Sequence, residues 1–277
     1  MQSLLQQKTW RFIDQSTSYD RSPLESFAMD DALCHLVGQG LSVPVVRTWV
    51  HDPYVVLGIQ DHRMPYIQEG IGELKKAGYE AIVRNSGGLA VVLDRGILNI
   101  SIVLSEAPGS ISINTGYEVM LQFVKLLFPE AADQIQAYEI VGSYCPGSYD
   151  LSIGGKKFAG ISQRRIRNGV AVQIYLCMEG SGSERAELIK RMYQTSLQDV
   201  RTKFRYPDIR PEVMASLSEL LDRTVTVQET VIRVQQLLAS LSDQVLFQPL
   251  NQDESDLYSF YLKRVLDRNL KLIGKNT

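Results

Sequence analysis

Cys145 is the residue of this chain best suited to nucleophilic chemistry. It lies in the segment Gly142–Asp150, which is rich in loop-forming residues and separates two expected strands. A loop thiol near backbone amides can be exposed and activated as a nucleophile. Cys34 and Cys177 lie within apolar elements, where a free cysteine packs as a small hydrophobic residue. From these residues alone, a structural role and a nucleophilic role for Cys145 remain equally open.

Lys157 is the second candidate, because it follows the Gly154-Gly155 turn of an expected hairpin. An ammonium group near Cys145 would favour the thiolate over the thiol, and it could orient an acyl carbonyl or handle a proton. Successive strand residues point to opposite faces, so only one of Lys156 and Lys157 can face a given site. The alternative is a pair of solvated lysines.

The segment Asn85-Ser86-Gly87-Gly88 is the third candidate, a polar break between two apolar runs. Glycines let a backbone approach a ligand closely, and Asn and Ser supply short polar contacts. The main-chain amides could bind an anion or hold a carbonyl oxygen as charge develops on it. A simple turn is the alternative.

Other kinds of chemistry have little support. The three histidines lack the spacing of paired metal ligands, and the chain has neither a Cys-x-x-Cys pair nor a phosphate-binding glycine loop. A formal net charge of −2 argues against a general nucleic-acid binder. No run approaches the roughly 18–20 apolar residues of a membrane span, and no secretory signal is present. Three unpaired thiols fit a reducing compartment, so we expect a cytoplasmic protein.

The elements that must position these residues follow from periodicity. A helix begins after Ser22 and stops at Gly38, because an N-cap serine and Pro23 precede a helical apolar pattern. Hairpin-joined strands dominate from residue 43 to 178, which predicts an α+β fold with a largely antiparallel sheet. We expect one catalytic domain over 1–277, with a helical C-terminal portion from about 183. The expected strands are 43–50, 54–60, 79–84, 90–93, 98–104, 138–141, 149–153, 156–161 and 170–178; the other expected helices are 64–77, 117–128 and 253–272.

Two of these segments resemble motifs of lipoate–protein ligases. Arg84–Asp94 is similar to the family pattern Arg-Arg-x-Ser-Gly-Gly-Gly-Ala-Val-x-His-Asp, and Gly155–Gly160 is similar to Gly-x-Lys-[Ile/Phe]-x-Gly. The resemblance covers about residues 25–250 and implies a biotin/lipoate–protein ligase-like fold, with a mixed, largely antiparallel sheet flanked by helices. It also implies that Lys157 is essential. The substrate-binding residues that it implies are Arg84, Asn85, Ser86, Gly87, Gly88 and Gly160.

The departures from the ligase pattern point to a different activity. Leu93 replaces the motif histidine, Leu89 its third glycine, and Ile59 an arginine. A loop cysteine twelve residues before the lysine is instead similar to the cysteine-dependent octanoyltransferases of the superfamily. The segment 141–163 most resembles the branch that acts on the octanoylated glycine cleavage H protein.

That resemblance implies transfer of octanoyl from a lysine of the H protein to a lysine of 2-oxoacid dehydrogenase lipoyl domains, through a Cys145 thioester and without ATP or a metal. Lys157 would activate the thiol and position the acyl carbonyl. An exchange of one amide for another is nearly isoenergetic, which agrees with the absence of a cofactor. An acyl carrier protein donor and a non-catalytic acyl-domain binding module are the alternatives. Arg164, Arg165 and Arg167 could form a basic patch for acidic lipoyl domains, or could simply be solvated.

Overall fold

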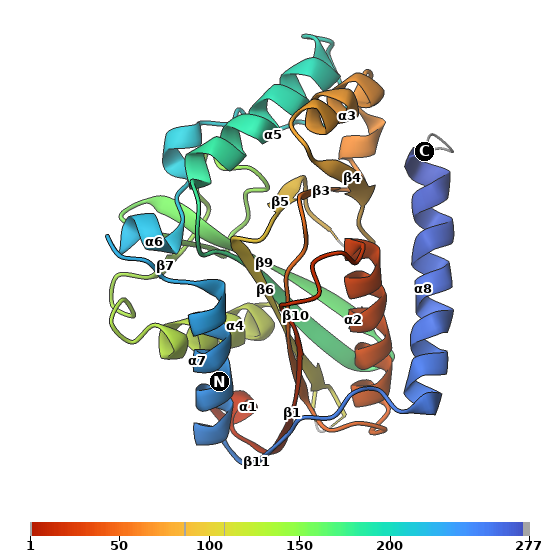
Figure 1. The fold of residues 1–277 in the computed structure, drawn as a ribbon, viewed down its shortest axis with the longest axis vertical. Coiled ribbons are helices and arrows are strands. Elements are labelled where there is room, and N and C mark those ends of the chain that lie inside the picture. The colour runs from red at the N-terminus through yellow and green to blue at the C-terminus, as the bar shows by residue number, and fades with distance from the viewer. Residues whose placement is uncertain (1, 86, 108, 274–277) are drawn as a thin grey trace.

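The strands of the described residues form two sheets, a large one of eight strands and a small one of three (Figure 1). The structure is a computed structural model that describes residues 2–85, 87–107 and 109–273. The strand order of the large sheet is β11-β1-β2-β6-β10-β9-β8-β7, and its pairs are antiparallel except that β1 runs parallel to both β2 and β11. The strands are β1 (Gln7–Gln15), β2 (Val45–Trp49), β6 (Ile97–Ser105), β7 (Gln136–Ala137), β8 (Asp150–Ile153), β9 (Lys156–Ile166), β10 (Gly169–Cys177) and β11 (Ser242–Leu246).

A second, three-stranded sheet contains the strands on either side of the segment Asn85-Ser86-Gly87-Gly88. Its order is β4-β3-β5, with β3 (Tyr54–Leu57) parallel to β4 (Glu80–Val83) and antiparallel to β5 (Val91–Leu93). The motif therefore forms the connection between β4 and β5. The strand residues on either side of it, Val83 and Val91, are both buried.

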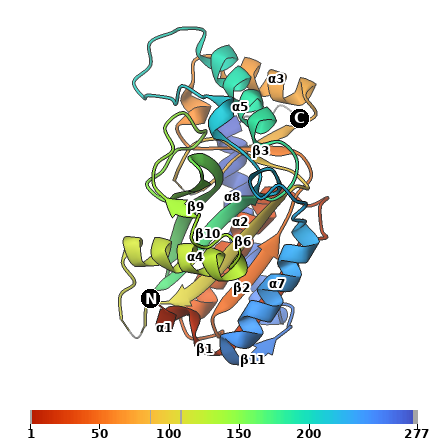
Figure 2. The same cartoon turned by 90° about the vertical axis from the view of Figure 1, so that its left-hand side faces the viewer.

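Helices cover both sheets (Figures 1 and 2). Helices α2 and α8 lie on one face of the large sheet, α4 and α7 lie on the other, and α3 and α5 pack over the small sheet. Ser22 caps α2 as expected, because its Oγ accepts a hydrogen bond from the amide of Leu24 at 3.3 Å. The helices are α1 (Gln2–Leu5), α2 (Pro23–Gly38), α3 (Ile67–Lys76), α4 (Ile113–Leu127), α5 (Gly182–Leu197), α6 (Leu217–Leu220), α7 (Val227–Ser240) and α8 (Gln252–Ile273).

The fold class predicted from the sequence is confirmed, two local predictions are wrong, and one strand was missed. The strand expected at 138–141 is a loop, and the two residues of β7 lie just before it. The polar edge strand β11 falls in a part of the chain where we expected helices, and β1 was not predicted. Both are stabilised by pairing between distant segments, Gln7 with Ser242 for example, which local periodicity does not show.

Candidate active site

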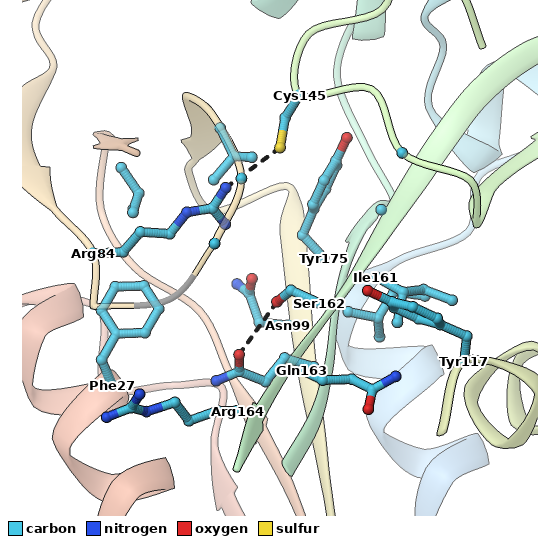
Figure 3. A pocket seen from close by; sticks show the side chains of 18 of the residues that line it. Phe27, Arg84, Asn99, Tyr117, Cys145, Ile161, Ser162, Gln163, Arg164 and Tyr175 are labelled. Carbon is cyan, nitrogen blue, oxygen red and sulfur yellow. Dashed lines mark hydrogen bonds between the residues drawn. The ribbon is translucent and has the colours of Figure 1, made fainter. Parts of the chain in front are cut away.

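Cys145 lies in the loop between β7 and β8, where its half-buried side chain reaches a cavity (Figure 3). Its backbone has φ 46°, in the left-handed region that a side chain other than glycine seldom adopts. Such a conformation costs of order 1–3 kcal/mol and is a common feature of active sites. The Sγ atom accepts hydrogen bonds from the main-chain amide of Leu89 at 3.2 Å and from Nη2 of Arg84 at 3.3 Å. The sulfur thus has one main-chain donor and one guanidinium donor.

The β4–β5 loop supplies both of these donors. Arg84 is 6% exposed, and its Nη2 also donates to the carbonyl oxygen of Leu89 at 2.7 Å. Gly88 has φ +102°, and a Cβ at this position would lie 2.1 Å from Nη2 of Arg84 and 3.1 Å from Sγ of Cys145. Only glycine leaves room for the guanidinium group and the thiol to meet. Gly88 thus serves the close approach that the sequence suggested.

The other motif residues anchor the loop or border the cavity. Asn85 Nδ2 donates to Oδ2 of Asp31 on α2 at 3.0 Å, and Gly87 lies along the cavity wall. Ser86, also predicted as a binding residue, lies outside the described residues. The loop is therefore tied to a helix on one side of the thiol.

Lys157 is fully buried at the start of β9, whereas its neighbour Lys156 is exposed, as strand alternation predicts. Its Nζ donates to the carbonyl oxygens of Tyr144 at 3.0 Å and of Cys145 at 2.9 Å. It also forms an ion pair with Asp150 at 2.8 Å. Burial raises the pKa of the Asp150 carboxyl, and the ammonium opposes that rise. The contacts of Lys157 thus hold the main chain at Cys145, while the contacts to sulfur come from the β4–β5 loop.

The cavity has a volume of about 520 Å³, within the range of small-molecule sites. One part of its wall is apolar and comes from α2, β2 and the small sheet. Leu93, at the position of the ligase motif's histidine, belongs to this wall. The apolar residues of this part are Phe27, Trp49, Val56, Val91 and Leu93. A medium-length acyl chain fits the chemistry of this wall.

Gly160 and Tyr175 face each other across the β9–β10 pair. A Cβ on Gly160 would lie 2.7 Å from Cε1 of Tyr175, so glycine makes room for the ring at the cavity wall. The Tyr175 hydroxyl is buried and has no hydrogen-bond partner among the described residues. Figure 3 shows this hydroxyl at the end of the cavity that holds Cys145. Burial raises the pKa of Tyr175 well above 10, so the group stays a donor. Tyr175 sits in an apolar strand, which is why the sequence pattern did not single it out.

The described residues contain no group of three or more His, Cys, Asp or Glu side chains that could hold a metal ion. Burial lowers the pKa of His51 to about 4, so this histidine is neutral near pH 7. Within the part of the chain that the structure describes, no helix has the length and apolar character needed to cross a bilayer.

Comparison with known proteins gives the family. A model described as the lipoyl protein ligase A/B catalytic domain matches residues 22–239. A Lysinibacillus sphaericus protein named octanoyl-[GcvH]:protein N-octanoyltransferase is 65% identical over 277 residues, the whole of both chains. A Listeria monocytogenes protein named lipoyl-[GcvH]:protein N-lipoyltransferase is 47% identical over 274 residues, 98% of each chain.

Solved structures share the fold. A lipoate-protein ligase A bound with ATP aligns with a TM-score of 0.67 at 18% identity, covering 93% of this chain and 95% of the other. The chain belongs to the lipoyl protein ligase A/B catalytic domain family. It is an enzyme, an acyltransferase of protein lipoylation.

Proposed function

We propose that this enzyme moves an octanoyl group from a lysine of the glycine cleavage H protein to a lysine of the lipoyl domains of 2-oxoacid dehydrogenases, through a thioester on Cys145. The observation that carries the proposal is a thiol at an apolar cavity whose sulfur accepts hydrogen bonds from Leu89 and Arg84. The 65% identical relative named for octanoyl transfer involving GcvH supports the donor.

In the first step, the sulfur of Cys145 attacks the carbonyl carbon of the octanoyl-lysyl amide. A C–S bond forms, the C–N bond breaks, and the thiol proton ends on the amine of the released lysine. In the second step, the amine of the acceptor lysine attacks the thioester, a new amide forms, and a proton returns to sulfur. Reactants and products are both one amide and one amine, so no ATP is needed to drive the exchange.

Each site residue has a part in these steps. Arg84 and the Leu89 amide stabilise the thiolate, and Lys157 keeps Cys145 in its left-handed conformation by holding two successive carbonyl oxygens. The Tyr175 hydroxyl and the main-chain amides at Gly87 and Gly88 are the donors for the carbonyl oxygen as negative charge develops on it. Lys157 thus acts as a positioning residue for the nucleophile.

The cytoplasm is the compartment that we propose for this reaction. The three cysteines are free, and two of them, Cys34 and Cys177, are buried in the core. A nucleophilic thiol with no resolving partner functions best where thiols stay reduced.

The test is intact-mass measurement after incubation with octanoylated H protein, lipoylated H protein or octanoyl-acyl carrier protein in separate reactions. We expect one octanoyl adduct from octanoylated H protein, lost in Cys145→Ala, and its transfer to an added lipoyl domain. An adduct from the carrier protein alone would identify the donor as a thioester. An adduct from lipoylated H protein alone would mean that the transferred group is lipoyl and not octanoyl, as in the name of the Listeria monocytogenes relative. Absence of every adduct would contradict the thioester on Cys145.

Lys157 has its own test. We expect Lys157→Met to lower the rate of adduct formation by about 10²-fold, because Cys145 loses the contact that fixes its main chain. Lys156→Met is the matched control, since the exposed neighbour contacts solvent. Equal rates in the two variants would remove the positioning role.

A further inference from the structure

An arginine-lined groove lies next to the catalytic cavity, and neither step of the proposed reaction uses it. It is formed where the end of β9 meets α2 and α8, and it has a volume of about 500 Å³. Figure 1 shows α8 running along α2, so the groove joins segments far apart in the sequence. We call it the arginine groove; its basic residues are Arg164, Arg165, Arg167, Arg264 and Arg268, together with His35.

The charges of this groove are only partly neutralised. Arg164 pairs with Asp31 at 2.7 Å, and Arg165 pairs with Glu106 at 2.7 Å. The remaining three arginines are exposed, and among the described residues no carboxylate oxygen lies within 4.0 Å of their guanidinium nitrogens. The three are Arg167, Arg264 and Arg268. Asp31 is the acidic residue of the lining, and Arg164 already engages it.

This concentration of positive charge contrasts with the chain as a whole, which has a formal net charge of −2. The groove also presents Phe260, 54% exposed, with the guanidinium of Arg264 at 5.5 Å from its ring centroid. An aromatic ring among unpaired arginines is typical of a protein-binding surface, where both residue types are enriched.

The arginine groove adjoins the catalytic cavity. Asn85, Arg164 and Arg165 line both. A partner bound in the groove would therefore lie beside the cavity that holds Cys145. The substrate lysine must enter this cavity while the folded domain that carries it stays outside.

We propose that the arginine groove is the docking surface for an acidic face of the carrier domain whose lysine is acylated or deacylated. This inference rests on the proposed function and adds the surface that recognises the protein substrate. Because donor and acceptor react in turn with the same cysteine, both dock here through the same kind of acidic face. Arg264 and Arg268 extend the patch suggested by the sequence to α8, more than ninety residues further along the chain.

The test compares two charge reversals on α8 with the same change in net charge. Arg264→Glu/Arg268→Glu alters the groove, and Lys263→Glu/Lys271→Glu alters exposed lysines of the same helix outside its lining. With octanoylated H protein as donor, we expect the arginine variant to lower kcat/KM for Cys145 acylation about ten-fold or more, chiefly through KM. The lysine variant should stay within about two-fold of the wild type.

A small donor separates docking from folding and chemistry. With p-nitrophenyl octanoate, which has no carrier domain, both variants should acylate Cys145 at the wild-type rate. Raising NaCl from about 0.05 to about 0.5 M should lower kcat/KM of the wild type with octanoylated H protein, and this salt dependence should be weaker in the arginine variant.

Three outcomes would overturn the proposal. One is equal kcat/KM of the arginine and lysine variants with octanoylated H protein. Another is an equal loss with the small ester, which would indicate a structural defect. The third is tighter binding of a single-stranded DNA oligonucleotide than of H protein by the groove. A wild-type enzyme that no H protein acylates would instead contradict the proposed function, so the two failures are distinguishable.

Discussion

Cys145 and Cys177 both contact an arginine, yet their surroundings suit opposite roles. Sγ of Cys145 lies 3.3 Å from Arg84, and Sγ of Cys177 lies 2.9 Å from Arg185. Cys177 ends strand β10 and is fully buried, and this burial raises the pKa of its thiol to about 12. Cys145 is on a loop, half-buried, at the wall of a cavity.

The two arginines differ as much as the two thiols. Arg185 is held by Asp94 through two hydrogen bonds of 2.7 and 2.8 Å, so its charge is already compensated. Arg84 donates to the neutral carbonyl of Leu89 and to sulfur. A guanidinium without an ion pair among the described residues, a backbone amide and access to substrate together make a thiol reactive, and an arginine contact alone does not.

Exchange of each cysteine for serine should show the largest difference. Cys145→Ser should lower octanoyl transfer by about 10³-fold or more, because an alcohol is a far weaker nucleophile than a thiolate. Cys177→Ser should keep the transfer rate and lose about 1–2 kcal/mol of unfolding free energy, because a buried hydroxyl replaces a thiol. Transfer assays and urea unfolding measure the two effects. Comparable transfer losses would show that the two thiols do not divide into a reactive and a structural one.

Substitutions of Arg84 and Arg185 should likewise have different effects. Arg84→Gln should slow alkylation of Cys145 by iodoacetamide about 10- to 100-fold, since the thiolate loses its cation. Arg185→Gln should leave this rate unchanged and destabilise the fold by about 3 kcal/mol, because Asp94 is left without its partner. Alkylation followed by peptide mapping, with thermal unfolding of both variants, tests the pair. Slow alkylation of Cys145 in Arg185→Gln would contradict this difference between the two arginines.

The next effect concerns two buried tyrosines near the site. Tyr175 and Tyr144 both have a hydroxyl without a hydrogen-bond partner among the described residues, but only Tyr175 lines the cavity. Tyr175→Phe should lower kcat about ten-fold by removing a donor to the acyl oxygen, and Tyr144→Phe should change it by less than about two-fold. Steady-state kinetics with octanoylated H protein measures kcat of the two variants. Equal values would mean that the Tyr175 hydroxyl plays no part in acyl transfer.

The smallest effect is a pH dependence that belongs to Cys177. The thiol keeps its proton in the folded state up to a pKa of about 12, whereas an unperturbed thiol has a pKa of 9.0. Between these two pKa values the folded state binds more protons than the unfolded state, so the free energy of unfolding falls as pH rises above 9. Between pH 9 and pH 10, the wild type should lose about 1 kcal/mol more unfolding free energy than Cys177→Ala. Parallel stability profiles would show that the buried thiol does not contribute.

Much of the fold could be predicted from local signals. The cap at Ser22 and the hairpin around Gly154-Gly155 form where the sequence places them, because caps and tight turns are stabilised by neighbouring residues. The edge strand β11 and the loop at 138–141 were not predicted, since long-range pairing decides them. The sequence brought Lys157 near Cys145, but periodicity does not show which atoms meet: the Nζ group contacts the carbonyl oxygen of Cys145 and the carboxylate of Asp150.

The family, the α+β class and the two residues on which we expect catalysis to depend, Cys145 and Lys157, could all be predicted before the fold was known. Residue types and spacing suffice for these because they are properties of continuous segments. The packing of distant segments was needed to show that Arg84 and not Lys157 contacts sulfur, that Tyr175 lines the cavity, and that α8 completes an arginine groove. Each of these depends on side chains from distant segments meeting at one point, which follows from how the sheets and helices pack.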